Sequence, residues 1–315
     1  MAEVKDMDIE LRAAYCRTLM ELAEKDPRVV VLEADLMKAS GTMPFKDAFG
    51  KRAVDVGVAE ADMVGIASGL SVQGFIPFAA TFGCFAARRT FDQFFISSNY
   101  AKLNVKLTGT DPGVSAVYNG GTHMPFEDVG MMRLIPDLII IDPSDTQSLY
   151  DLTIQAYATG KCTYTRTRRK GGTHRYAPGQ VKLGKGNILA DGKDLAIVAT
   201  DEVIVNEAVK AVEMLAQKGI RATLVDITTI KPLDTDLLEK VSKETGHVLV
   251  CENARYAGGL GEAVAAHLAR TYPAKMDFIC VDERFGEVGK LDYLMKTFHL
   301  TAEDIAAKAE ALARR

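Results

Sequence analysis

Short apolar segments alternate with longer segments of helical periodicity along almost the whole chain. Residues 8–25 place apolar side chains three and four positions apart, as an amphipathic helix does, and the apolar run Val29–Leu32 follows after a short turn. Most of the apolar runs lack the polar–apolar alternation of a strand with one wet face. This pattern indicates a parallel sheet covered by helices on both sides, and so predicts an α/β fold.

The alternation lapses once, in an irregular stretch over residues 168–188 that contains Gly171-Gly172 and Pro178-Gly179. A chain of 315 residues is long enough for two domains. We predict that each domain has a largely parallel sheet flanked by helices. The predicted divisions are a first domain over residues 1–170, a linker over 171–188 and a second domain over 189–315. Strands are predicted at 29–32, 54–58, 75–80, 105–108, 138–141, 163–167, 195–200, 222–226, 247–251 and 278–281. Helices are predicted at 8–25, 61–72, 84–97, 126–134, 144–158, 203–217, 235–243, 261–270, 289–297 and 301–313.

The charge balance excludes some classes of partner. Lys and Arg number 38 and Asp and Glu 42, which gives a formal net charge of −4. Such a chain has no basic field to attract nucleic acid or an anionic membrane. The five cysteines form no C-x-x-C pair and suit reduced thiols in a cytoplasmic protein, and residues 1–6 show no apolar core of a signal peptide.

One uncharged stretch, residues 63–87, is long enough to cross a bilayer. It contains four glycines and Pro77, and Gly74 and Pro77 divide it into shorter pieces. We therefore predict a buried helix, strand and helix start here, not a membrane span.

Three places combine residue types that suit chemistry. Glu60 lies between an apolar strand and a Gly/Ala-rich helix, where it is either a functional carboxylate or an ordinary first-turn acid like Asp62. His123 follows a Gly-rich loop after a strand, a position where parallel sheets bind ligands, although a loop histidine without a role is the alternative. The basic run that begins at Arg166 suits a phosphate or is a solvated charge cluster.

Several common motifs are missing from the sequence. It contains no P-loop, no nucleophile elbow and no dinucleotide-binding Gly pattern after a strand. No His, Asp and Glu set has metal-ligand spacing. The run Gly258–Gly261 opens a predicted helix, where it either cradles an anion or permits close packing of the helix.

Taken together, these segments resemble the C-terminal half of the transketolase family, over nearly the whole chain. The matching segments are Leu11-Arg12-Ala13-Ala14, Glu33-Ala34-Asp35-Leu36, Gly57-Val58-Ala59-Glu60, Thr81–Phe85, Gly121-Thr122-His123 and Gly258–Glu262. Full-length members also carry a Gly-Asp-Gly signature followed by Asn, which holds the metal and the diphosphate of thiamine diphosphate. This sequence has no Gly-Asp-Gly.

The resemblance therefore implies one subunit of a split transketolase, with a pyrimidine-binding domain and a transketolase C-terminal domain. The partner chain would carry Gly-Asp-Gly and the downstream Asn, and would hold Mg²⁺ or another divalent cation. An α2β2 assembly with the active site between unlike chains is the expected arrangement.

The resemblance also assigns residues to the cofactor. Glu60 matches the family glutamate that hydrogen-bonds N1′ of the aminopyrimidine, where a carboxyl group shares a proton and favours the imino tautomer. Phe82 and Phe85 match the aromatic residues that pack on that ring. Asp35 matches an aspartate near the cofactor. Glu60 and His123 are the expected catalytic residues.

For the substrate, His123 matches a histidine that contacts the reacting sugar carbons, and Arg12 matches an arginine that binds the substrate phosphate. Ser40 is the candidate for its serine partner. Arg166 and Arg169 are the first choices for a further phosphate contact. Asn119 stands where the family usually has an aspartate that touches a substrate hydroxyl, which leaves the acceptor preference open.

The implied reaction transfers a two-carbon ketol unit from a ketose phosphate to an aldose phosphate through an adduct with thiamine diphosphate, as in pentose phosphate metabolism. Alternatives within the superfamily are a 1-deoxyxylulose-5-phosphate synthase, a 2-oxo-acid dehydrogenase beta chain, and a split transketolase for a branched or sulfonated sugar. A non-catalytic subunit that stabilises or regulates a thiamine enzyme is the alternative from another class.

Overall fold

The computed structural model describes residues 9–314, which divide into two compact units. The first unit contains residues 9–112 and 131–183, and the second contains 113–130 and 184–314. Residues 113–130 thus belong to the second unit, although they lie within the predicted first domain, because Val114 and Phe126 bury their side chains in the second core. The domain boundaries themselves stay a prediction.

The first unit is built on a parallel sheet in which the predicted strands pair side by side. In spatial order its strands are β5 (Ile139–Ile141), β6 (Thr163–Thr167), β4 (Lys106–Thr110), β3 (Ile76–Phe82), β1 (Val29–Glu33) and β2 (Ala53–Asp55). Every neighbouring pair among them is parallel. All five residues of β1, β4 and β6 are buried, as expected for strands covered on both faces.

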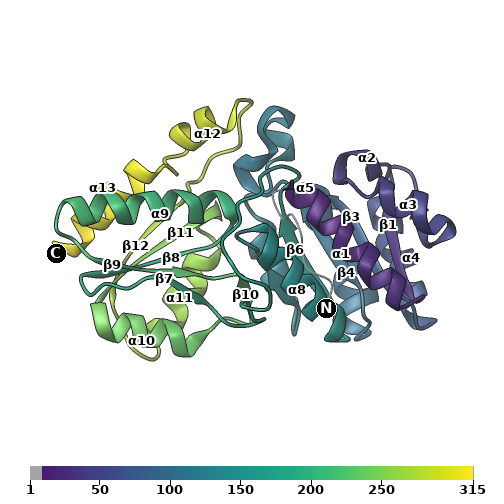
Figure 1. The fold of residues 1–315 in the computed structure, drawn as a ribbon, viewed down its shortest axis with the longest axis horizontal. Helices are drawn as coiled ribbons and strands as arrows, with labels where there is room; N and C mark the ends of the chain where they lie inside the picture. The colour runs from purple at the N-terminus through teal and green to yellow at the C-terminus, as the bar shows by residue number, and fades with distance from the viewer. Residues whose placement is uncertain (1–8, 315) are drawn as a thin grey trace. The chain divides into compact units, whose positions relative to one another are not determined.

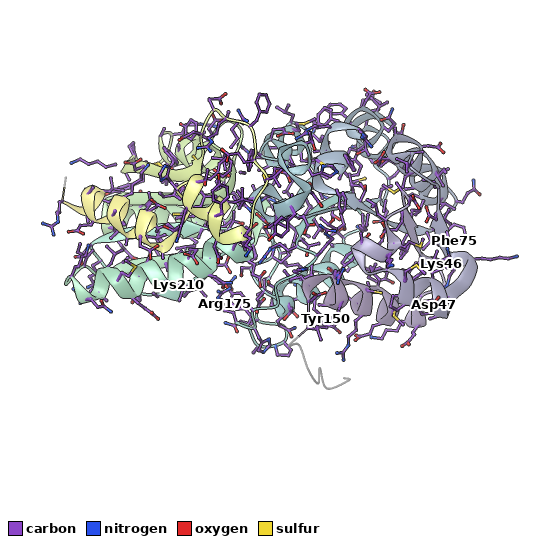
Figure 2. The ribbon with its side chains drawn as sticks, turned by 90° about the horizontal axis from the view of Figure 1, so that it is seen from above. Lys46, Asp47, Phe75, Tyr150, Arg175 and Lys210 are labelled. Carbon is purple, nitrogen blue, oxygen red and sulfur yellow. The ribbon has the colours of Figure 1, made fainter. Side chains whose placement is uncertain are left out.

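The helices of this unit pack on the sheet through apolar faces. Helix α1 (Leu11–Lys25) lies beside α8 (Thr146–Ala158), and both contribute to one core with β1 and β3. Tyr150 of α8, labelled in Figure 2, donates from its hydroxyl to Glu21 of α1 at 2.8 Å. Helix α8 begins after Asp145, whose side chain accepts from the Ser148 amide at 2.6 Å, so its start differs slightly from the predicted Ser144.

The uncharged stretch 63–87 forms most of α4 (Glu60–Val72), all of β3 and most of α5 (Gly83–Arg88), which confirms the predicted helix, strand and helix. No helix among residues 9–314 is long and apolar enough to cross a membrane.

The predicted helix at 84–97 is wrong in its continuity, since α5 is followed by α6 (Phe91–Gln93) and the π-helix η2 (Phe94–Tyr100). The Thr90 hydroxyl donates to the Ala86 carbonyl at 2.6 Å and so competes with the helical ladder there.

Short helices appear where none was predicted. They are α2 (Met37–Ser40), α3 (Met43–Phe49) and η1 (Gly50–Arg52) in the loop after β1, and η3 (Gly113–Asn119) and η4 (Gly121–His123) in the Gly-rich segment. The helix predicted at 126–134 is the shorter α7 (Asp128–Arg133). Runs this brief have too few residues to show a helical period.

The second unit has a smaller sheet with helices on both faces. In spatial order its strands are β12 (Lys275–Val281), β11 (His247–Arg255), β8 (Leu195–Ala199), β9 (Ala222–Asp226) and β7 (Asn187–Ala190). The short strand β10 (Thr229–Lys231) follows β9 in the chain but does not belong to this sheet. Figure 1 shows α9 (Glu202–Gln217) and α13 (Ala302–Ala313) on one face, and α10 (Thr235–Thr245) and α11 (Leu260–Leu268) on the other. Helix α12 (Leu291–Thr297) precedes α13.

One strand of this sheet departs from the prediction. β7 pairs antiparallel with β9 and begins inside the predicted linker, where its four residues are too few to show a strand pattern. The other pairs in the sheet are parallel, so both units have the predicted α/β architecture.

Candidate active site

Glu60 lies at the carboxyl-terminal edge of the first sheet. The chain leaves β2 at Asp55, turns at Gly57 with φ of 74°, and enters α4 with Glu60 as its first residue. The side chain of Glu60 is only 4% exposed, and its Oε1 accepts from Nη1 of Arg89 at 2.8 Å. Its Oε2 accepts no hydrogen bond from the residues that the structure describes. Glu60 is thus a buried acid with one oxygen bonded and one open to a donor.

Arg89 links this acid to the predicted aromatic residues. It caps the C-terminus of α5, and its Cζ lies 4.0 Å from the centroid of the Phe85 ring. The Phe82 and Phe85 rings are 5.9 Å apart and tilted by 42°. Both follow from β3, since Phe82 is its last residue and Phe85 lies in the helix that follows at once.

A second arginine, which is also paired with an acid, lies over the Phe82 ring. Arg169 Cζ lies 4.8 Å from the Phe82 centroid, and its guanidinium is paired with Asp111. The Arg169 amide also donates to Asp111 Oδ1 at 2.9 Å. Burial raises the pKa of Asp111, and the Arg169 charge counteracts that rise. An arginine paired with an acid therefore lies over each phenylalanine ring. We call these two sets of residues, Phe85–Arg89–Glu60 and Phe82–Arg169–Asp111, the two stacks.

The two stacks fit an aminopyrimidine by the chemistry of their donors and surfaces. The aromatic rings suit a flat heterocycle, and the open Glu60 oxygen suits a ring nitrogen that carries a proton. Among residues 9–314 no group of three or more His, Cys, Asp or Glu side chains could hold a metal ion.

Asp35 and Arg12 lie near the loops that follow β1 and β2. Asp35 is exposed, has φ of 61°, and donates from its amide to Asp55 Oδ1 at 2.9 Å. Arg12 is paired with Glu10 at 2.7 Å and donates to the Ala39 carbonyl at 3.2 Å. The structure shows neither side chain in contact with the two stacks, and their predicted roles stay predictions.

Ser40 is buried, with 2% exposure, and its hydroxyl donates to Glu33 at 2.8 Å. Thr42 donates to the other Glu33 oxygen at 2.7 Å. Burial raises the pKa of Glu33 to about 8, while the two hydroxyl donors counteract the rise. A substrate acceptor at Ser40 would compete with Glu33 and with the Leu36 carbonyl, which is 2.7 Å from the same hydroxyl.

Arg166 is fully buried in β6, and its Nη1 contacts Asp142 Oδ2 at 2.5 Å. A guanidinium enclosed in this way favours a structural ion pair over the predicted contact with a substrate phosphate. Arg169, at 23% exposure, is the more accessible of the two predicted arginines.

His123 and Asn119 lie in the second unit, whereas the two stacks belong to the first. His123 is half-buried and its Nδ1 is 2.9 Å from the Thr122 hydroxyl, whereas Asn119 is exposed. The loop between them depends on Gly121, because a Cβ there would lie 2.2 Å from the carbonyl oxygen of Gly286. That close contact fixes the backbone that carries His123.

The glycine run Gly258–Gly261 binds a carboxylate of the same chain, that of Glu252, at the start of α11. The buried carboxylate of Glu252 accepts from the amides of Leu260 and Gly261 at 2.7 and 2.8 Å. A Cβ on Gly259 would lie 2.4 Å from Glu252 Oε2, so the glycine gives the carboxylate room. The run is therefore an internal helix cap.

Sequence reasoning missed Arg89, Asp111 and Glu252. Arg89 was visible only as one of two adjacent arginines inside the helix predicted at 84–97. Asp111 directly follows β4, so its position at a strand end was the available signal.

Two family models match this chain: the transketolase pyrimidine-binding domain at residues 7–172, and the transketolase C-terminal domain at residues 184–305. The chain therefore belongs to the transketolase family. Subunits of this family are transferases that depend on thiamine diphosphate.

Similar proteins include separate transketolase subunits. The 6-deoxy-6-sulfo-D-fructose transketolase subunit SqwH of Clostridium sp. (strain MSTE9) is 42% identical over 99% of this chain and 97% of that protein. An apulose-4-phosphate transketolase subunit of Phocaeicola vulgatus is 32% identical over 83% of this chain and 84% of its own length. A solved structure of a split gene transketolase, an inactive beta4 tetramer, has a TM-score of 0.88 at 36% identity and covers 97% of this chain and 98% of that one.

Proposed function

We propose that this chain is the catalytic, pyrimidine-binding subunit of a two-chain transketolase that moves a two-carbon ketol unit from a ketose to an aldose. The observation that carries the proposal is Glu60, a buried acid with one open oxygen beside the stacked ring of Phe85. The similarity to separate subunits over nearly the whole chain supports a partner polypeptide.

When bound, thiamine diphosphate supplies a nucleophilic ring carbon and an electron sink for cleavage of the ketose. Glu60 shares a proton with N1′ of the aminopyrimidine, and Phe82 and Phe85 pack on that ring, with Asp35 nearby. The partner chain holds the diphosphate and the divalent cation, Mg²⁺ in our proposal. The assembly is α2β2 and cytoplasmic.

The proposed substrate roles follow the family resemblance, residue by residue. His123 donates a hydrogen bond or moves a proton at the reacting sugar carbons, and Arg12 and Arg169 hold the terminal anion of the sugar. We propose a sulfonated ketose as the donor, since the similar Clostridium protein is a 6-deoxy-6-sulfo-D-fructose transketolase subunit. Asn119, in place of the usual aspartate, fits a departure from the common sugar phosphates.

The test begins with the partner. This chain is captured from its native extract, and the protein that copurifies in equal amount is sequenced. We expect a chain with Gly-Asp-Gly and a downstream Asn. Recovery of this chain alone, or with an unrelated protein, would contradict the two-chain proposal.

In the reconstituted complex, Glu60→Ala should lower ketol transfer by roughly 10²–10⁴-fold, the usual contribution of an acid–base group. Asp62→Ala is the matched control, because Asp62 is a more accessible acid in the same helical turn. Near-normal turnover in Glu60→Ala would identify a non-catalytic subunit. Comparing 6-deoxy-6-sulfofructose, fructose 6-phosphate and apulose 4-phosphate as donors then tests the substrate.

A further inference from the structure

We infer that Arg89 is a positioning residue that fixes the Glu60 carboxylate so that one oxygen stays available to the cofactor. The inference rests on the proposed function, in which Glu60 meets the aminopyrimidine. Arg89 and Glu60 are 29 residues apart in the chain and meet only because α5 and α4 both begin at the same edge of the sheet.

The two oxygens of the Glu60 carboxylate have different surroundings. Arg89 Nη1 bonds Oε1 at 2.8 Å, and Oε2 has no donor among residues 9–314. A carboxylate held at one oxygen loses most of its rotational freedom. The remaining oxygen therefore meets an incoming ring N–H in a single orientation.

Arg89 also compensates for the burial of the Glu60 side chain. The Glu60 side chain is 4% exposed, and Arg89 is its only ion-pair partner in the described part of the chain. A buried carboxylate without a cation is strongly disfavoured. Removing the guanidinium would leave Glu60 to bury its charge alone or to turn toward solvent.

Arg89 is itself held in place by an aromatic ring. Its side chain is 49% exposed, which alone would leave it mobile, but its Cζ lies 4.0 Å from the Phe85 centroid. The guanidinium lies over the ring and at the same time donates a hydrogen bond to Glu60. A lysine retains the charge but lacks this planar geometry, so Arg89→Lys should replace only part of the function.

An alternative role for Arg89 is to block the cofactor site, as a plug. In that case the guanidinium occupies the Phe85 face and the Glu60 oxygen in place of the aminopyrimidine, and must leave when the cofactor binds. The two roles make opposite predictions: removal of a positioning residue weakens cofactor binding, and removal of a plug strengthens it.

The experiment measures thiamine diphosphate binding to the two-chain complex by isothermal titration calorimetry, and ketol transfer at saturating cofactor. We expect Arg89→Met to weaken binding by about 10- to 100-fold, the loss of a charged hydrogen bond, and to lower kcat even when cofactor saturates. Arg89→Lys should recover part of both.

Arg28→Met is the matched control. It removes another arginine–acid pair of the first unit, Arg28 with Asp26 at 2.7 Å, whose guanidinium is 60% exposed. It should leave cofactor binding and turnover unchanged, and thermal melts should show that all variants fold. Unchanged or tighter binding by Arg89→Met would overturn the inference, while wild-type complex that neither binds the cofactor nor transfers ketol units would overturn the proposed function as well.

Discussion

Arg166 and Arg169 are close in sequence but have different surroundings. Arg166 lies within β6, where its side chain is fully enclosed and paired with the buried Asp142. Arg169 lies beyond the strand end, pairs with Asp111 and covers one face of Phe82. Position relative to the end of a strand thus separates an enclosed arginine from a more accessible one.

Paired substitutions test this difference. Arg166→Met removes the buried ion pair between Arg166 and Asp142, so we expect it to lower the free energy of unfolding by about 3–5 kcal/mol in urea titrations. Arg169→Met should cost less stability, because the Arg169 side chain is 23% exposed, and it should also raise KM for the anionic donor in the assembled enzyme. The reverse pattern would show that Arg166 is the anion-binding residue.

The first amides of α11 find their hydrogen-bond acceptor in a side chain of the preceding strand. Glu252, near the end of β11, reaches across to the first amides of the helix, and Gly259 leaves room for the carboxylate. Two hydrogen bonds and the helix dipole favour the same charge at this point. The strand and the helix that follows it are therefore joined by a side chain as well as by the loop.

Glu252→Gln keeps the size of this side chain but removes its charge and one acceptor. We expect a loss of about 1–3 kcal/mol in the free energy of unfolding, because one helix amide loses its partner. Glu239→Gln, on the surface of α10, should change stability little. Equal stability of both variants would rule out an important cap, and the measurement is chemical denaturation followed by circular dichroism.

At the scale of the molecule, two buried ionisable groups give stability a dependence on pH. Burial raises the pKa of Glu33 to about 8, and burial lowers the pKa of Lys106 to about 7. Lys106 is 2% exposed and its Nζ donates to the Lys161 carbonyl at 2.5 Å and to Thr159 at 3.3 Å. Neither acceptor carries a charge, so the lysine is easily deprotonated.

The two groups act in opposite directions. Between its ordinary pKa of 4.5 and about 8, Glu33 keeps its proton only in the folded chain, so its contribution to stability is present at low pH and is lost as the pH rises. Between about 7 and 10.5, Lys106 keeps its proton only in the unfolded chain, so stability rises with pH there. Together the two groups should place the minimum of their contribution to the free energy of unfolding between about pH 7 and 8.

Denaturation curves over both windows test this dependence. The Glu33→Gln curve should lack a downward slope of up to about 1.4 kcal/mol per pH unit that the wild-type curve has, and the Lys106→Met curve should lack an upward one. Parallel curves for wild type and variant would mean that the group titrates alike in the folded and unfolded chain.

The sequence by itself determined the α/β class, most strands, and the location of Glu60 at the start of a helix, because apolar periodicity and helix-start signals are local. Tertiary structure alone decided the π-helix after Phe94, the antiparallel β7 and the burial of Arg166. It also decided that Arg89 meets Glu60, a contact between residues distant in the chain. Such pairings depend on which strand ends the sheet brings together, and no local pattern encodes that choice.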